Sequence, residues 1–127
     1  MSKFSRQLDG TVLTDTNWNN IFIYNGLSNE WANGNYVVEL NVLSVSGGGE
    51  SRFNIYDGTS NKYGYIETTG VHRFTFEDGT MKHFIDGTEI TAQRKTYDNT
   101  VSTFQFIIIF TNNARTMKFK GFKLYSL

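Results

Sequence analysis

The chain has 127 residues, 16% of them aromatic, and its 12 basic and 12 acidic residues give a formal net charge of zero. The absence of cysteine excludes disulfide bonds and cysteine nucleophiles. Nucleic-acid binding is disfavoured because it needs clustered cations, and membrane insertion because no apolar run approaches ~20 residues. We therefore expect one domain over residues 1–127, with a core built from its aromatic residues.

The first part of the chain predicts three strands. Two short ones are expected at Phe4–Leu13 and Asn17–Tyr24, and the segment Leu27–Asn33 between glycines is the one weak helical candidate. A clearer strand follows at Tyr36–Val45, where apolar residues occupy every second position. The glycines at 47–49 end that strand in a loop.

The middle of the chain predicts two further strands. The first is Arg52–Tyr56, with Phe53 and Ile55 directed into the core, and the second is Lys62–Thr68. Because side chains alternate between the two faces of a strand, Asn54 should point away from that core.

Two Asp-Gly pairs give the strongest local signal. The stretches Val71–Glu77, Thr80–Ile85 and Thr88–Gln93 are rich in strand-forming residues and are separated by Asp78-Gly79 and Asp86-Gly87. Asp-Gly favours the type I′ turn, in which both central residues have positive φ. A three-stranded antiparallel meander is therefore predicted.

The C-terminal part predicts two more strands, at Thr103–Thr111 and Thr116–Tyr125. In the second, the apolar alternation shifts phase at Gly121, which indicates a β-bulge. The three lysines of this strand alternate with apolar residues, so they indicate a solvent-facing row. The total of about nine or ten strands, without linkers or internal repeats, predicts an all-β antiparallel sandwich.

The order of these features from Trp31 to Leu127 resembles a concanavalin A-like jelly roll, as found in laminin G-type lectins and carbohydrate-binding modules. That resemblance implies a jelly-roll arrangement of the strands. It is carried by Tyr36–Val42, Ser51–Tyr56, Val71–Gly79, Lys82–Gly87 and Phe119–Tyr125.

The resemblance implies binding and no catalytic residues. Hydrolases of that broad group carry alternating carboxylates on one strand, whereas Glu39 stands alone here and Glu77 and Asp78 lie at a hairpin turn. We therefore expect no enzyme activity. His72 and His83 lie on adjacent predicted strands and could face each other as a metal pair, although structural histidines are the commoner interpretation.

The resemblance also suggests a structural calcium ion, because such families often hold one with loop carboxylates. Asp57, Asp78, Asp86 and Asp98 lie in or beside turns, where their ordinary role is to form the turn, and Asp9, Asp15 and Asn17 are equally plausible calcium partners. None of these residues has a defined calcium spacing, so no metal ligand and no cofactor is assigned, and a structural calcium ion stays an open alternative.

Aromatic and amide side chains are the best candidates for a binding site, because a sugar ring stacks its C–H face on an aromatic ring. Tyr56 is expected to point outward with Asn54. The competing interpretation is that Trp31 plugs the end of the core and the tyrosines pack at its rim. The candidate ligand-binding residues are Tyr56, Tyr63, Tyr65, Asn54, Asp57, Asn61 and Trp31.

We predict a non-catalytic carbohydrate-binding module or lectin-like domain whose partner is a glycan or cell-surface polysaccharide. The alternative is a structural or receptor-binding module of a virion, such as a phage tail, or of a cell-surface fibre; this module could be a homo-oligomer. No apolar secretion segment follows Met1. We expect an extracellular or virion-associated location, with either a secretion signal removed from this chain or another route out of the cell.

Overall fold

The computed structural model describes residues 5–14, 19–24, 35–56, 60–98, 106–112 and 114–126, with the backbone alone described for 5–14, 19–24, 106–108, 110 and 126. The helical candidate at 27–33 lies outside these ranges. The strands are β1 (Ser5–Thr14), β2 (Asn19–Tyr24), β3 (Tyr36–Ser46), β4 (Glu50–Tyr56), β5 (Asn61–Tyr65), β6 (Gly70–Glu77), β7 (Thr80–Ile85), β8 (Thr88–Glu89), β9 (Lys95–Thr96), β10 (Phe106–Asn112) and β11 (Thr116–Ser126).

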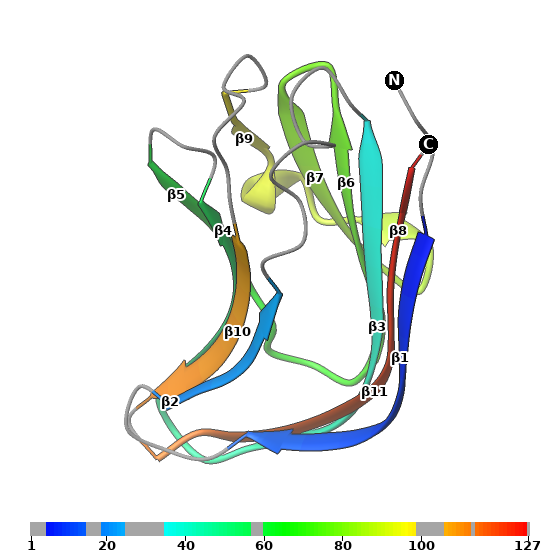
Figure 1. The fold of residues 1–127 in the computed structure, drawn as a ribbon. Coiled ribbons are helices and arrows are strands. Elements are labelled where there is room, and N and C mark those ends of the chain that lie inside the picture. The colour runs from blue at the N-terminus through cyan, green and yellow to red at the C-terminus, as the bar shows by residue number, and fades with distance from the viewer. Residues whose placement is uncertain are drawn as a thin grey trace.

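Two antiparallel sheets pack face to face and form a β-sandwich (Figure 1). The larger sheet has the strand order β1-β11-β3-β6-β7-β8, with β9 also pairing with β7, and the smaller sheet has the order β2-β10-β4-β5. Within the described ranges, nine strands have five residues or more, while β8 and β9 have two each. The predicted all-β sandwich of nine or ten strands is confirmed.

Both predicted Asp-Gly turns are present. Asp78 and Gly79 have φ of 50° and 84°, and Asp86 and Gly87 have φ of 48° and 87°. Positive φ at both central residues is the type I′ geometry, whose twist matches that of the flanking strands. The turn before β7 therefore pairs Glu77 with Thr80, as the meander requires.

The third strand of the meander is shorter than predicted. Pairing with β7 stops after Glu89, and Thr91–Gln93 form a 3₁₀ turn (η1) instead of continuing the strand. The backbone N–H of Gln93 donates to the carbonyl of Ile90, and Arg94 forms a bidentate ion pair with Glu89 at 2.7 and 2.9 Å. These local bonds turn the chain back, so that β9 pairs with the other end of β7.

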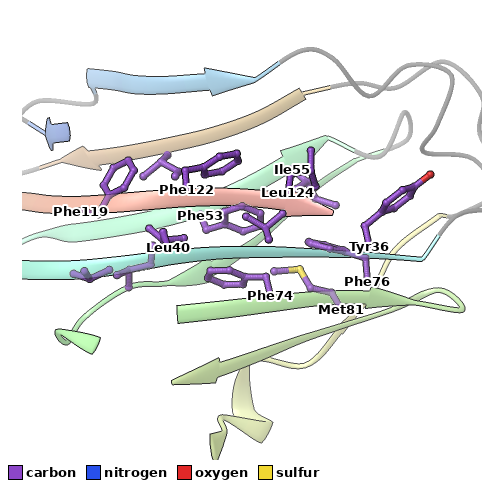
Figure 2. Close-up of a cluster of buried hydrophobic side chains, with 14 of the residues drawn as sticks. Tyr36, Leu40, Phe53, Ile55, Phe74, Phe76, Met81, Phe119, Phe122 and Leu124 are labelled. Atoms are coloured by element: carbon purple, nitrogen blue, oxygen red, sulfur yellow. The ribbon is translucent and has the colours of Figure 1, made fainter. Parts of the chain in front are cut away.

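The core lies between the two sheets and is formed by alternate residues of each strand (Figure 2). Phe53 of the smaller sheet stacks on Phe74 of the larger one, with ring centroids 4.1 Å apart. The predicted inward face of β3 is confirmed, since Tyr36, Val38, Leu40 and Val42 are all buried. The fully or almost fully buried apolar residues also include Ile55, Ile66, Phe76, Met81, Ile109, Met117, Phe119, Phe122 and Leu124.

The sandwich is bent. In Figure 1, β1 and β11 turn at their lower ends toward the side of the smaller sheet, and β2 and β10 turn the same way inside them. The outer face of the smaller sheet is therefore on the concave side. Register shifts within β1, β10 and β11 accompany the bend, as expected because bulges bend strands. The predicted bulge at Gly121, whose φ is 66°, is one of these shifts.

Candidate functional site

The tyrosines of β5 lie on the outer face of the smaller sheet. In the β4–β5 register, Tyr65 is opposite Arg52, and Tyr63 is opposite Asn54. Gly64, between the two tyrosines, faces the core instead, since a Cβ there would lie 3.0 Å from Phe74. Strand alternation therefore directs both tyrosine rings away from the core.

The two rings and a guanidinium group form one cluster on this face. The rings of Tyr63 and Tyr65 meet edge to face, with centroids 5.5 Å apart and an interplanar angle of 82°. The Arg52 guanidinium carbon lies 4.3 Å from the centroid of the Tyr63 ring and 5.3 Å from that of Tyr65. Lys95 adds a second cation, 5.4 Å from the Tyr63 ring. Cation–π attraction therefore draws both charged groups toward the tyrosines.

Arg52 is fixed by an ion pair. Its Nε and one terminal nitrogen both donate to Glu50 Oε2, at 2.9 and 2.6 Å. The backbone N–H of Glu50 in turn donates to the Asn112 side chain at 2.9 Å, which holds the backbone of Glu50 to the neighbouring strand β10. Hydrogen bonding to Tyr63 and burial raise the pKa of Tyr65, which stays protonated at neutral pH. We name Arg52, Tyr63, Tyr65 and Lys95 the tyrosine–arginine cluster.

The amide residues predicted for the site lie beside this cluster. Asn54 lies on the same outer face, but only 7% of it is exposed. Its Nδ2 donates to Asn61 Oδ1 at 3.1 Å, and Asn61 is exposed. Asn54 therefore presents little surface of its own and holds Asn61, which is the accessible amide of the pair; a ligand-binding role for Asn54 stays a prediction.

Tyr56 also differs from its prediction. It was expected to point outward with Asn54, but it is half-buried and packs against the hydrophobic core. Tyr56 ends β4, where its partner is Asn61 at the start of β5. This contact fits the competing interpretation, packing at the rim of the core, and a ligand-binding role for Tyr56 stays a prediction. Asp57 and Trp31 lie outside the described residues.

Three members of the site were missing from the sequence-based candidates: Arg52, Lys95 and Gln93. Gln93 Oε1 accepts the backbone N–H of Tyr65 at 3.4 Å. Arg52 could have been found from the sequence, because it is two residues from Asn54 on the same strand and therefore lies on the same face. Lys95 and Gln93 carry no such signal, because η1 and β9 approach β5 only in the folded chain.

A small cavity of about 170 Å³ adjoins the cluster at the side of the sandwich. Tyr65 and Gln93 contribute to its wall on the side of the cluster, and His83 and Ile85 of β7 contribute from the larger sheet. Glu67, Thr68 and Ile90 complete the lining. The outer face at Tyr65 therefore adjoins a pocket with both polar and apolar walls.

The two histidines bond to each other. His72 Nδ1 lies 2.8 Å from His83 Nε2, and His72 Nε2 lies 2.8 Å from the carbonyl oxygen of Thr68. A carbonyl only accepts, so His72 carries its proton on Nε2 and its Nδ1 accepts from His83 Nε2. His83 Nδ1 then carries no proton, and it has no hydrogen-bond partner among the described residues.

Burial keeps this pair uncharged. It lowers the pKa of His72, and burial together with the neighbouring His72 lowers the pKa of His83 to about 3. The direct contact at 2.8 Å leaves no space for a metal ion between the facing nitrogens, which fits the structural interpretation. Among the side chains that the structure describes, no three His, Asp or Glu residues are grouped closely enough to hold a metal ion. Nor do the described residues include a helix long and apolar enough to cross a membrane.

Comparison with known proteins identifies no family for this chain. No family model matches it, and neither does any curated protein sequence. Among solved structures, a galectin of Caenorhabditis elegans is similar over 86% of this chain and 94% of its own, with 8% sequence identity and a TM-score of 0.48. At that identity and score, the likeness assigns neither a family nor a ligand to this chain.

Proposed function

We propose that this domain is a non-catalytic carbohydrate-binding module that holds a glycan on the outer face of its smaller sheet, at the tyrosine–arginine cluster. The observation that carries this proposal is the set of tyrosine rings and an anchored guanidinium on one concave face. A sugar ring needs both kinds of partner, because it has an apolar C–H face and a rim of hydroxyl groups.

Different residues of the site contact the C–H face of the sugar and its hydroxyl groups. The Arg52 guanidinium lies closer to the ring of Tyr63 (4.3 Å) than to that of Tyr65 (5.3 Å), so Tyr65 offers the freer stacking surface for a sugar. Hydrogen bonds to the hydroxyls come from the guanidinium of Arg52 and the amide of Asn61, which present donors and an acceptor in fixed positions. The cavity beside Tyr65 gives room for a substituent of the sugar ring.

A glycan array, followed by calorimetry with the best neutral saccharide, tests this function. We expect binding by the wild type, with and without calcium, and affinity about tenfold weaker in Tyr65→Ala, which corresponds to ~1.4 kcal/mol. Tyr63→Ala should also weaken binding, because it removes the ring on which Arg52 rests. The matched control is Lys62→Ala, on the same strand but on the opposite face from the two tyrosines.

Two outcomes would contradict the proposal. One is that no plant, bacterial or animal glycan binds to the wild type. The other is that Lys62→Ala weakens binding as much as Tyr65→Ala while both variants keep the wild-type unfolding midpoint. The first outcome would favour the structural or receptor-binding role in a virion or fibre, which light scattering would then examine through the oligomeric mass.

A further inference from the structure

A second hollow lies on the opposite face of the molecule, over the outer surface of the larger sheet. Its volume is about 350 Å³, and three adjacent strands, β11, β3 and β6, form its floor. Figure 1 shows these strands on the side of the sandwich away from β5, so the hollow and the tyrosine–arginine cluster face in opposite directions. Its lining residues are Glu39, Leu40, Asn41, Val71, Lys120, Gly121 and Lys123.

The bulge in β11 arranges the polar part of this lining. Lys120 pairs with Asn41, and Lys123 pairs with Glu39, so three steps along β11 match two along β3. Without the bulge, residues three apart would point to opposite faces. Gly121 accommodates the shift with a φ of 66°. The bulge thus brings two lysines to the same outer face.

Strand β6 completes the arrangement on the other side of β3. Arg73 pairs with Glu39, and Val71 pairs with Asn41. One row across the sheet is therefore Lys123, Glu39 and Arg73. Val71 closes the neighbouring row and is 41% exposed, so it adds an apolar surface to the hollow.

Glu39 is held in place at the centre of the charged row. Tyr125 donates its hydroxyl proton to Glu39 Oε2 at 2.7 Å, and Arg73 Nε lies 3.9 Å from the same oxygen. Lys120 and Lys123 are exposed and form no ion pair with any described side chain. Among the described side chains around the hollow, Lys120, Lys123 and Arg73 therefore supply three positive charges. Glu39 supplies the single negative charge.

We propose that this hollow is a second binding site, for an acidic saccharide that carries a sulfate or a carboxylate group. Lys120 and Lys123 pair with the anionic group as mobile point charges. Glu39 and the Asn41 amide bond the sugar hydroxyls, and Val71 contacts the C–H face of the ring. A bare inorganic anion would satisfy the lysines alone and would be repelled by Glu39.

NMR titration of the ¹⁵N-labelled domain tests this site, using galactose 6-sulfate and glucuronic acid as probes, with galactose and inorganic sulfate for comparison. We expect saturable shifts of the Asn41, Val71 and Gly121 amides with at least one acidic sugar, and a dissociation constant at least tenfold lower than that of sulfate or galactose. Which of the two acidic sugars binds more tightly identifies the anionic group. Binding should weaken as ionic strength rises from about 0.1 to 0.5 M, because the lysines are exposed.

Charge variants separate a built site from a general cationic surface. Lys120→Gln combined with Lys123→Gln should weaken binding of the acidic sugar at least tenfold. Lys118→Gln is the matched control: this lysine is exposed on the same strand but does not line the hollow, so its loss should leave the affinity within about twofold. An equal loss of affinity in the double variant and in Lys118→Gln would overturn the proposal.

Glu39→Gln gives a test that depends on whether the affinity for each ligand rises or falls. Glutamine keeps an acceptor for Tyr125 but removes the negative charge. If Glu39 bonds sugar hydroxyls, the variant binds the acidic sugar more weakly while it binds inorganic sulfate more tightly. Tighter binding of both ligands, or equal affinity of the wild type for both, would mean that only adventitious anions bind. Tyr65→Ala should leave this site unchanged, so failure of one site is distinguishable from failure of the other.

Discussion

Acidification from pH 7 to pH 5 should destabilise this domain through its buried histidine pair. His72 and His83 are the chain's two histidines, and they are 0% and 1% exposed. In the unfolded chain each takes up a proton near its ordinary pKa of 6.5, whereas burial lowers both pKa values in the folded state. The unfolded state therefore binds more protons as the pH falls below about 6.5. Stability is complete above that pH and is lost progressively toward the folded-state pKa values.

The size of this loss follows from the pKa difference. With a folded-state pKa of about 3 for His83, lowering the pH from 7 to 5 costs about 2 kcal/mol through this residue alone, at ~1.4 kcal/mol per unit of pH once the unfolded histidine is protonated. His72 adds to the loss in the same direction. Two kcal/mol is a substantial part of the ~5–15 kcal/mol that stabilises a typical domain.

Urea unfolding at pH 7, 6 and 5 and constant ionic strength measures this effect, and His83→Gln is the informative variant. The glutamine amide can still donate to His72 Nδ1 but does not titrate, so the loss between pH 7 and 5 should shrink by about 2 kcal/mol. The variant will be less stable at every pH, because His83 also stacks on Phe74 at 4.3 Å. The informative quantity is therefore the change in the free energy of unfolding with pH, not its absolute value. A wild type equally stable at pH 5 and 7, or a variant with an unchanged slope, would refute the reasoning.

Two glycine substitutions make further predictions, each checked by urea unfolding at pH 7. Gly64→Ala should lower the free energy of unfolding by about 1–3 kcal/mol, because the new methyl group would lie 3.0 Å from Phe74 in a packed core. An unchanged free energy of unfolding would contradict this explanation. Gly47→Ala should cost at least about 2 kcal/mol, since Gly47 has a φ of 85° and a Cβ there would overlap the Ala114 carbonyl oxygen. Gly48→Ala is the control, because nothing lies within 4 Å of the added carbon. An equal loss of stability in Gly47→Ala and Gly48→Ala would contradict the explanation.

The sequence by itself determined the features that depend on near neighbours in the chain. The meander follows from two Asp-Gly pairs, because positive φ at consecutive residues is a local requirement. The inward face of β3 follows from its alternation, and the bulge at Gly121 from a break in alternation. Within β3 the alternation missed Val37, which lies on the opposite face of the strand, in register with Thr75 and Tyr125, and is nevertheless fully buried.

Only the tertiary structure decided which side chains meet at the two candidate sites. Tyr63 and Tyr65 were predictable as a pair, since residues two apart on a strand share a face. Arg52 joins them through the register of β4 with β5, and Lys95 joins them because η1 turns the chain back toward β5. The hollow beside Lys120 and Lys123 likewise depends on pairing between strands that are far apart in sequence. Register and strand order arise from the packing of the whole core, and a reading of local patterns cannot supply them.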